Sequence, residues 1–231
     1  MKKSRTLLAT VAAGLTIPTG ASAANSPNPN FAGYQFNNYV AVPATVSALI
    51  VVPKLKCTSG PERDIWPGVG IQSVSSFAGL DIFCKNGKAH YFAYIEVQSK
   101  AKVFAADAAK PGDKVTFKVY ESTAHVIGSA VDQTHAFTAT KTGAGSGTGN
   151  GVQVGDRPVY LGAGKLGVPN FGSITFTKAL ANGATSTPGP FGSLSPTAYN
   201  MFTTSSSSPL QVQTNPFTSN KESFKTVFKH S

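Results

Sequence analysis

Residues 77–84 (Phe-Ala-Gly-Leu-Asp-Ile-Phe-Cys) and 89–97 (Ala-His-Tyr-Phe-Ala-Tyr-Ile-Glu-Val) are strand-like runs, separated by Lys85-Asn86-Gly87-Lys88. An Asn-Gly pair between two β-rich runs is the strongest short hairpin signal, because both residues accept a positive φ. A two-residue turn also fixes the register of the two strands. The stretch therefore predicts a hairpin in which Cys84 opposes Ala89 and Phe77 opposes Glu96.

Because side chains alternate along a strand, this register divides the hairpin into two faces. One face is apolar and predicts a core surface: Ala78, Leu80, Ile82, Cys84, Ala89, Tyr91, Ala93 and Ile95. The other face is aromatic with two acids: Phe77, Gly79, Asp81, Phe83, His90, Phe92, Tyr94 and Glu96. Such a surface suits a cleft that holds an extended ligand. Packing within a second, partly buried sheet face is the alternative.

The start of the chain has the features of a secretory signal peptide. Three basic residues in the first five are followed by a short apolar run at 6–17 and by Ala21-Ser22-Ala23, a typical cleavage site. The apolar run is too short to span a bilayer, so no membrane anchor is expected. We predict a signal peptide at residues 1–23, a linker at 24–30 and one domain at 31–231.

Charge and cysteine content agree with export. Removing the signal would lower the formal net charge from +10 to +7, which leaves a basic domain able to associate with anionic cell-surface polymers. Basic patches interleaved with aromatic residues are absent from the sequence, so nucleic acid is not an expected partner. An exported chain with two cysteines favours a disulfide between Cys57 and Cys84.

The remaining sequence predicts more short strands and no convincing amphipathic helix. Strand-like runs occur at residues 45–53, 114–121, 124–141, 158–162 and 170–177. The glycine-rich stretch 143–151 reads as a flexible loop, since no helix start or Lys-Ser/Thr pair follows it to make a phosphate site. Many short strands joined by turns predict an all-β fold, an antiparallel double-sheet sandwich of the concanavalin-like kind.

Several motifs together resemble the glutamic peptidases, or eqolisins. They are Phe31-Ala32-Gly33-Tyr34, Val46 to Pro53 followed by Cys57, Trp66 with Gly70-Ile71, the hairpin to Glu96, Pro111-Gly112-Asp113-Lys114-Val115, and Asn170-Phe171-Gly172-Ser173 with Ile174-Thr175-Phe176-Thr177. The resemblance covers the chain from about Phe31 to its C-terminus. It implies a secreted acid endopeptidase fold made of two seven-stranded antiparallel sheets.

The resemblance also implies a Gln–Glu catalytic dyad, which the sequence lacks at the matching positions. The family's Gln-x-Gly motif matches Phe77-Ala78-Gly79, and its Ala-Glu-Trp-Ile-Val-Glu motif matches residues 158–163, which puts Val159 at the first Glu. A phenyl ring can neither donate to an oxyanion nor accept a proton. Losing an oxyanion donor costs about 10²–10³ in rate and losing a general base about 10²–10⁴.

We therefore expect a non-catalytic binding protein for an extended peptide or polysaccharide. Its expected groove residues are Phe77, Asp81, Phe92, Tyr94, Glu96 and Tyr160. The main alternative is an active acid endopeptidase that pairs Gln72 with Glu96, and a domain without a groove ligand is a third possibility. No cofactor is expected, and the four histidines have no metal-binding spacing.

Overall fold

The computed structural model describes residues 25–104, 109–147, 150–161, 164–183, 185, 187–205 and 207–230. The expected signal peptide at residues 1–23 lies outside the described residues. The chain forms one continuous sheet in the order β10-β9-β8-β3-β14-β18-β17-β16-β2-β11-β4-β5-β6-β7. β1 pairs with β16, β15 pairs with β14, and β12 and β13 make a separate small ladder.

The strands have the following bounds: β1 Ser26–Asn28, β2 Ala32–Tyr39, β3 Ala44–Val51, β4 Arg63–Ile71, β5 Ser76–Lys85, β6 Lys88–Val97, β7 Lys100–Phe104, β8 Lys114–Glu121, β9 His125–Asp132, β10 Thr138–Ala144, β11 Asn150–Pro158, β12 Tyr160–Leu161, β13 Gly164–Lys165, β14 Ser173–Ala181, β15 Gly189–Pro190, β16 Thr197–Phe202, β17 Leu210–Thr214 and β18 Phe224–Phe228. A 3-10 turn, η1, spans Phe191–Leu194.

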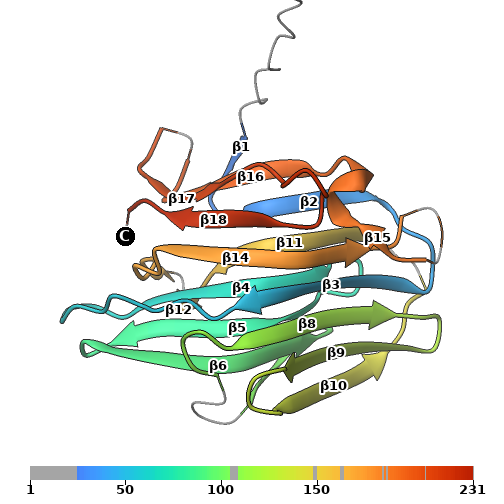
Figure 1. Cartoon of the computed structure of the whole chain (residues 1–231), viewed down its shortest axis with the longest axis horizontal. Coiled ribbons are helices and arrows are strands. Elements are labelled where there is room, and N and C mark those ends of the chain that lie inside the picture. Colours follow the sequence, from blue (N-terminus) through green and yellow to red (C-terminus); the bar gives the residue numbers. More distant parts are fainter. Residues whose placement is uncertain are drawn as a thin grey trace, which may run out of the picture.

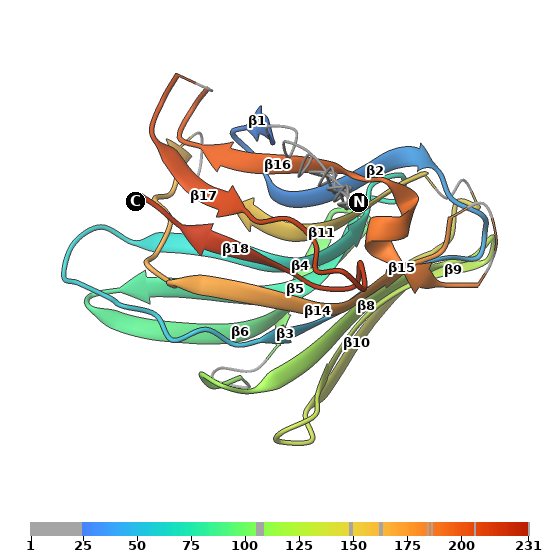
Figure 2. The ribbon, with the colours of Figure 1, turned by 45° about the horizontal axis from the view of Figure 1, so that its top comes forward.

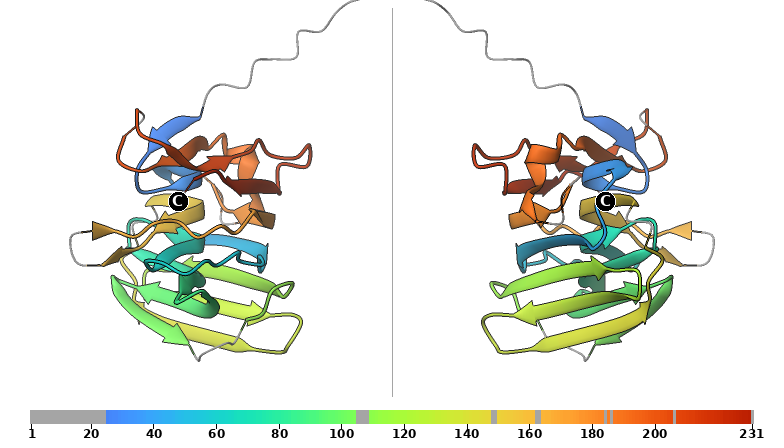
Figure 3. Two further views of the ribbon diagram at one scale, coloured as in Figure 1. Left: turned by 90° about the vertical axis from the view of Figure 1, so that its left-hand side faces the viewer. Right: turned by 90° about the vertical axis from the view of Figure 1, so that its right-hand side faces the viewer.

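The long sheet folds back on itself between β17 and β16, which gives two layers of seven strands (Figures 1 and 2). One layer runs from β10 to β17 and the other from β16 to β7. β5 and β6 of the second layer contact β8 and β9 of the first, and Figure 3 shows the two layers from both ends. The predicted antiparallel double-sheet sandwich is confirmed, with one parallel pair at β1 and β16.

The predicted central hairpin is confirmed residue for residue. β5 and β6 pair from Phe77 opposite Glu96 to Cys84 opposite Ala89. Asn86 and Gly87 close the turn with φ angles of 52° and 75°, the left-handed conformations that an Asn-Gly turn supplies.

The core lies between the layers and is built from alternating strand residues. On the hairpin, the predicted apolar face is buried except for the partly buried Ala89, and Leu80, Ile82 and Ile95 are fully enclosed. On the facing β8, Val115, Phe117 and Val119 are buried while the residues between them are not, as the alternation at 114–121 predicts.

Two segments differ from the sequence prediction. Within the expected linker at 24–30, residues 26–28 form β1, and Asn25 Nδ2 donates to Asn200 Oδ1 at 3.0 Å and to the Thr214 carbonyl at 2.6 Å. Residues 150–158 form β11, whereas the prediction placed a loop up to residue 151 and started a strand at 158. β11 pairs with β2 and β4, both distant in sequence, so its own glycine-rich sequence gives little sign of it.

The predicted disulfide is present between Cys57 and Cys84, and it ties the loop before β4 to the end of β5. No helix among the described residues is long and apolar enough to cross a bilayer.

Candidate functional site

The groove face is the surface of β11, β4, β5 and β6 that points away from the other layer. The ladder register places four residues side by side across these strands: Gln153 on β11, Gly70 on β4, Phe77 on β5 and Glu96 on β6. Neighbouring strands are about 4.8 Å apart, so Gln153 and Phe77 start about 10 Å apart with only a glycine between them. We call this set the central row.

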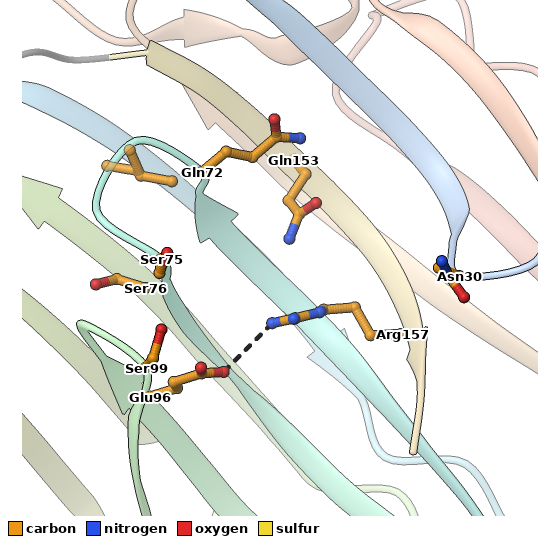
Figure 4. A pocket seen from close by; sticks show the side chains of 9 residues that line it. Asn30, Gln72, Ser75, Ser76, Glu96, Ser99, Gln153 and Arg157 are labelled. Carbon is orange, nitrogen blue, oxygen red and sulfur yellow. Dashed lines mark hydrogen bonds and ion pairs between the residues drawn. The ribbon is translucent and has the colours of Figure 1, made fainter. Parts of the chain in front are cut away.

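Gln153 presents an amide nitrogen to the groove. Its Oε1 accepts a hydrogen bond of 3.1 Å from Nε2 of Gln35 on β2, which turns its own Nε2 the other way. A Cβ atom on Gly70 would lie 3.0 Å from this Nε2, so the amide uses space that any other residue at position 70 would fill. Figure 4 shows the Gln153 amide pointing into the pocket beside Gln72.

Phe77 is fully buried although it lies on the groove face. Its ring covers a second row, in which Gly155, Gly68 and Gly79 pair across three strands. A Cβ on Gly68 would lie 2.6 Å from Cζ of Phe77, and one on Gly79 would lie 2.8 Å from Cε1. The phenyl ring therefore fills the hollow that the glycines leave, and it does not line an open groove.

Glu96 is held by two polar neighbours. Its Oε2 accepts a hydrogen bond of 3.2 Å from the hydroxyl of Tyr94 and lies 3.4 Å from Nη1 of Arg157. The guanidinium of Arg157 also lies 5.1 Å from the centroid of the Phe77 ring, a cation–π contact. Burial and the nearby Glu96 carboxylate raise the pKa of Tyr94 above its usual value, so its hydroxyl stays protonated as the donor.

These side chains border two adjoining pockets. The first has a volume of about 330 Å³ and is mainly polar; it is lined by Asn30, Ile71, Gln72, Ser75, Ser76, Glu96, Ser99, Gln153 and Arg157. The second has a volume of about 430 Å³ and is lined by Asn30, Trp66, Arg157, Pro158 and Tyr160. Asn30 and Arg157 border both, so the two pockets together form one extended depression.

Stacked aromatic rings continue along the groove face. Trp66 stacks on Tyr94 with ring centroids 4.2 Å apart, and Phe83 stacks on His90 at 4.8 Å and on Phe92 at 5.5 Å. These contacts fit the alternative of a partly buried packing face for Phe83 and Phe92. Trp66 and Tyr160 border the second pocket.

Two carboxyl groups, Asp64 of β4 and Asp81 of β5, share the groove face beside Trp66. Burial, followed by the charge of Asp81, raises the pKa of Asp64 to about 9, and burial also raises the pKa of Asp81. Asp64 therefore carries a proton at neutral pH and donates it to Asp81. Sharing one proton leaves the two carboxyl groups with one negative charge in the sheet instead of two.

The structure brings together some of the predicted site residues and not others. Gln72 and Glu96, the alternative dyad, line the same pocket. Tyr160 borders the second pocket, is half exposed, and its hydroxyl donates to Oδ1 of Asn30. Val159 lies past the end of β11 and is buried, away from the central row.

Gln153 and Arg157 are the site residues that the sequence analysis missed. Val152-Gln153-Val154 alternates apolar and polar side chains as a strand does, but the alternation ends at the buried polar residue Asp156, so the sequence signal for β11 is short. Gln153 and Arg157 are four residues apart on one face. The two glutamates of the family motif have the same spacing.

Comparisons with known proteins agree with this architecture. The family model described as the Peptidase A4 family matches residues 29–226. The chain belongs to the peptidase A4 family. None of the curated proteins compared with the chain matches it.

Solved structures of peptidase A4 relatives share the fold at low sequence identity. One is scytalido-glutamic peptidase with a transition state analog inhibitor, at 13% identity and a TM-score of 0.64, covering 87% of this chain and 99% of that one. Another is SCP-B, a member of the eqolisin family of peptidases, in a complex with the tripeptide Ala-Ile-His; it is 14% identical, with a TM-score of 0.66 and the same coverage.

Proposed function

We propose that this chain is a secreted, non-catalytic member of the peptidase A4 family that binds extended peptides along the depression around Arg157. The observation that carries the proposal is the central row. The position that matches the family's glutamine holds the buried ring of Phe77, and the polar residue that faces it across Gly70 is the amide Gln153.

We further infer that Gln153, and not Val159, occupies the position of the catalytic glutamate. Gln153 lies on the strand upstream of the Phe-Gly-Ser segment, shares the row with Phe77, and has the motif's four-residue spacing to Arg157. An amide cannot accept a proton from water at any ordinary pH. The inherited reaction would then lack both its base and its oxyanion donor, whose combined losses leave very little rate.

A peptide fits the polar pocket better than a polysaccharide does. The pocket offers the Gln72, Gln153 and Asn30 amides, which can each donate and accept, as a peptide backbone does. Arg157 can contact a carboxylate at a chain end or side chain. The eqolisin SCP-B is described in a complex with a tripeptide, which supports the same ligand class here.

The single tryptophan of the chain offers a direct binding test, because Trp66 borders the second pocket. We expect a mixture of short peptides to change Trp66 fluorescence saturably and to be recovered intact by mass spectrometry. Gln153→Ala should weaken the binding at least about fivefold, since it removes a pocket amide. An oligosaccharide series that binds while peptides do not would replace the peptide assignment.

The second candidate is an acid endopeptidase that uses Glu96 with Gln72, because both side chains line one pocket. Against it, Oε2 of Glu96 is already engaged by Tyr94 and Arg157, and a water molecule would compete with both. Cleavage of an unfolded protein at about pH 3 that is lost in Glu96→Gln and in Gln72→Ala would establish this candidate. Glu62→Gln is the matched control, since Glu62 pairs with Lys85 outside the pocket.

A further inference from the structure

A cluster of two aspartates and a histidine lies outside the groove, at one end of the β8–β9 pair. Asp113 is in the turn before β8, Asp132 is the last residue of β9, and His135 follows in the turn towards β10. Val115 pairs with Asp132, which brings the two turns together, and the Gln133 amide donates to the Lys114 carbonyl at 2.9 Å. The cluster therefore joins two segments on well-paired strands.

One ligand atom from each residue faces a common point. Nδ1 of His135 lies 3.1 Å from Oδ1 of Asp113 and 3.7 Å from Oδ2 of Asp132, and all three atoms lie within 4.8 Å of one another. Two ligands of a tetrahedral zinc ion, each about 2.0–2.2 Å from the metal, lie about 3.3–3.6 Å apart. The observed separations bracket that value.

Each aspartate has one oxygen fixed by the backbone and the other turned towards the imidazole. Oδ1 of Asp132 accepts from the amides of Thr134 at 2.7 Å and His135 at 3.2 Å, and Oδ2 of Asp113 accepts from the Lys110 amide at 2.7 Å. Such backbone bonds orient ligating carboxylates in metal sites.

The environment of Oδ2 of Asp132 indicates a bound cation. The side chain of Asp132 is completely buried, and this oxygen has no hydrogen-bond partner among the described residues. A charged histidine does not resolve this, because Nδ1 carries one proton and Asp113 is the nearer acceptor. A buried carboxylate oxygen without a partner is costly, and a divalent ion would contact both aspartates at once.

We propose that Asp113, Asp132 and His135 bind a divalent transition-metal ion of the Zn²⁺ or Mn²⁺ type. Imidazole nitrogen with two carboxylate oxygens suits these ions, whereas Ca²⁺ takes six to eight oxygen ligands. The two carboxylates balance the charge of the ion, and His135, which is half exposed, leaves an open side for entry and for water ligands. The bound ion clamps the 110–113 turn to the turn after β9.

The test is calorimetric titration of the full chain, freed of metal with a chelator, with ZnCl₂, MnCl₂ and CaCl₂ at about pH 7.5. We expect one equivalent of Zn²⁺ or Mn²⁺ to bind, weaker binding of Ca²⁺, and a higher Tm in excess Zn²⁺, because an ion that binds only the native state stabilises it.

His135→Ala is the first variant, since its half-exposed side chain can be removed without disturbing the core, and it should weaken binding at least about tenfold. Asp132→Asn should do the same. His125→Ala is the matched control, because His125 is exposed at the opposite end of β9 from Asp132, and its removal should leave binding unchanged. The proposal is overturned if the wild-type chain binds no ion up to about 1 mM, or if His135→Ala binds as tightly as the wild type. If these residues form only an ion pair, adding Zn²⁺ will leave the Tm unchanged, and that result also overturns the proposal.

Discussion

The two faces of the β5–β6 hairpin both carry large side chains, but these side chains are buried in different ways. The core face packs against β8 and β9, and its members other than the partly buried Ala89 are buried by the opposite layer. The groove face has no layer over it. There, Phe77 is buried by lying flat over the glycines of its own sheet, and Arg157 covers its ring. An aromatic residue on an outer face can thus be part of the packing and unavailable to a ligand.

This difference is tested most sharply by truncating two aromatic residues of the groove face, one fully buried and one half-buried. Phe77→Ala should lower the free energy of unfolding by about 3–5 kcal/mol, as for a core phenylalanine, because the surrounding glycines cannot close the cavity. Phe92→Ala, at a half-buried position, should cost less than about 2 kcal/mol. Urea unfolding measures both variants, and equally small losses in their free energies of unfolding would mean that Phe77 lies in an open groove.

The disulfide ties the groove strand β5 to the loop before β4, and its removal should have a comparable effect. The bond joins residues 27 apart in sequence. Reduction, or the Cys57→Ser/Cys84→Ser double variant, should lower stability by about 3–4 kcal/mol through the greater freedom of the unfolded chain. The change in denaturation midpoint on adding a reductant measures it, and an unchanged midpoint would contradict it.

Gly79 of the second row and Gly70 of the central row predict a third difference between positions on the same face. A Cβ on Gly79 would lie 2.2 Å from the backbone oxygen of Pro67, whereas one on Gly70 would meet its nearest atom at 2.9 Å. Gly79→Ala should therefore destabilise the fold by about 2–3 kcal/mol. Gly70→Ala should cost less, since its Cβ meets the Ser76 backbone oxygen at the longer distance of 2.9 Å and its next contact, Nε2 of Gln153, is the end of a side chain that can move. Thermal unfolding of the two variants provides the comparison. If Gly70→Ala proved more destabilising than Gly79→Ala, the close packing of the Phe77 ring over Gly68 and Gly79 would not be important for stability.

Buried carboxyl groups should make the protein more stable in acid than at neutral pH. Burial raises the pKa of Asp156 to about 7 and that of Asp64 to about 9, so the native state holds protons that the unfolded state releases near pH 4. The contribution of these groups to the free energy of unfolding is complete below about pH 4, and it falls as the pH rises towards 7 to 9. Asp156→Asn should reduce the fall in Tm between about pH 4 and pH 7, and a slope unaffected by it would refute this explanation.

The hairpin could be predicted because its information is local: an Asn-Gly turn fixes the register, and the register fixes both faces. The central row could not, because it depends on β11, whose partners β2 and β4 lie more than 70 residues away along the chain. The Cys57–Cys84 pairing followed from there being two cysteines in a chain with export features. The burial of Phe77 required knowing that Gly68 and Gly79 would pair beneath its ring.

The central claim is that the groove retains binding but has lost hydrolysis, and the cleavage rate of an unfolded protein substrate at about pH 3 tests it most directly. We predict no cleavage by the wild-type chain above the background without enzyme. Wild-type cleavage that disappears in Glu96→Gln and persists in the Glu62→Gln control would contradict the account.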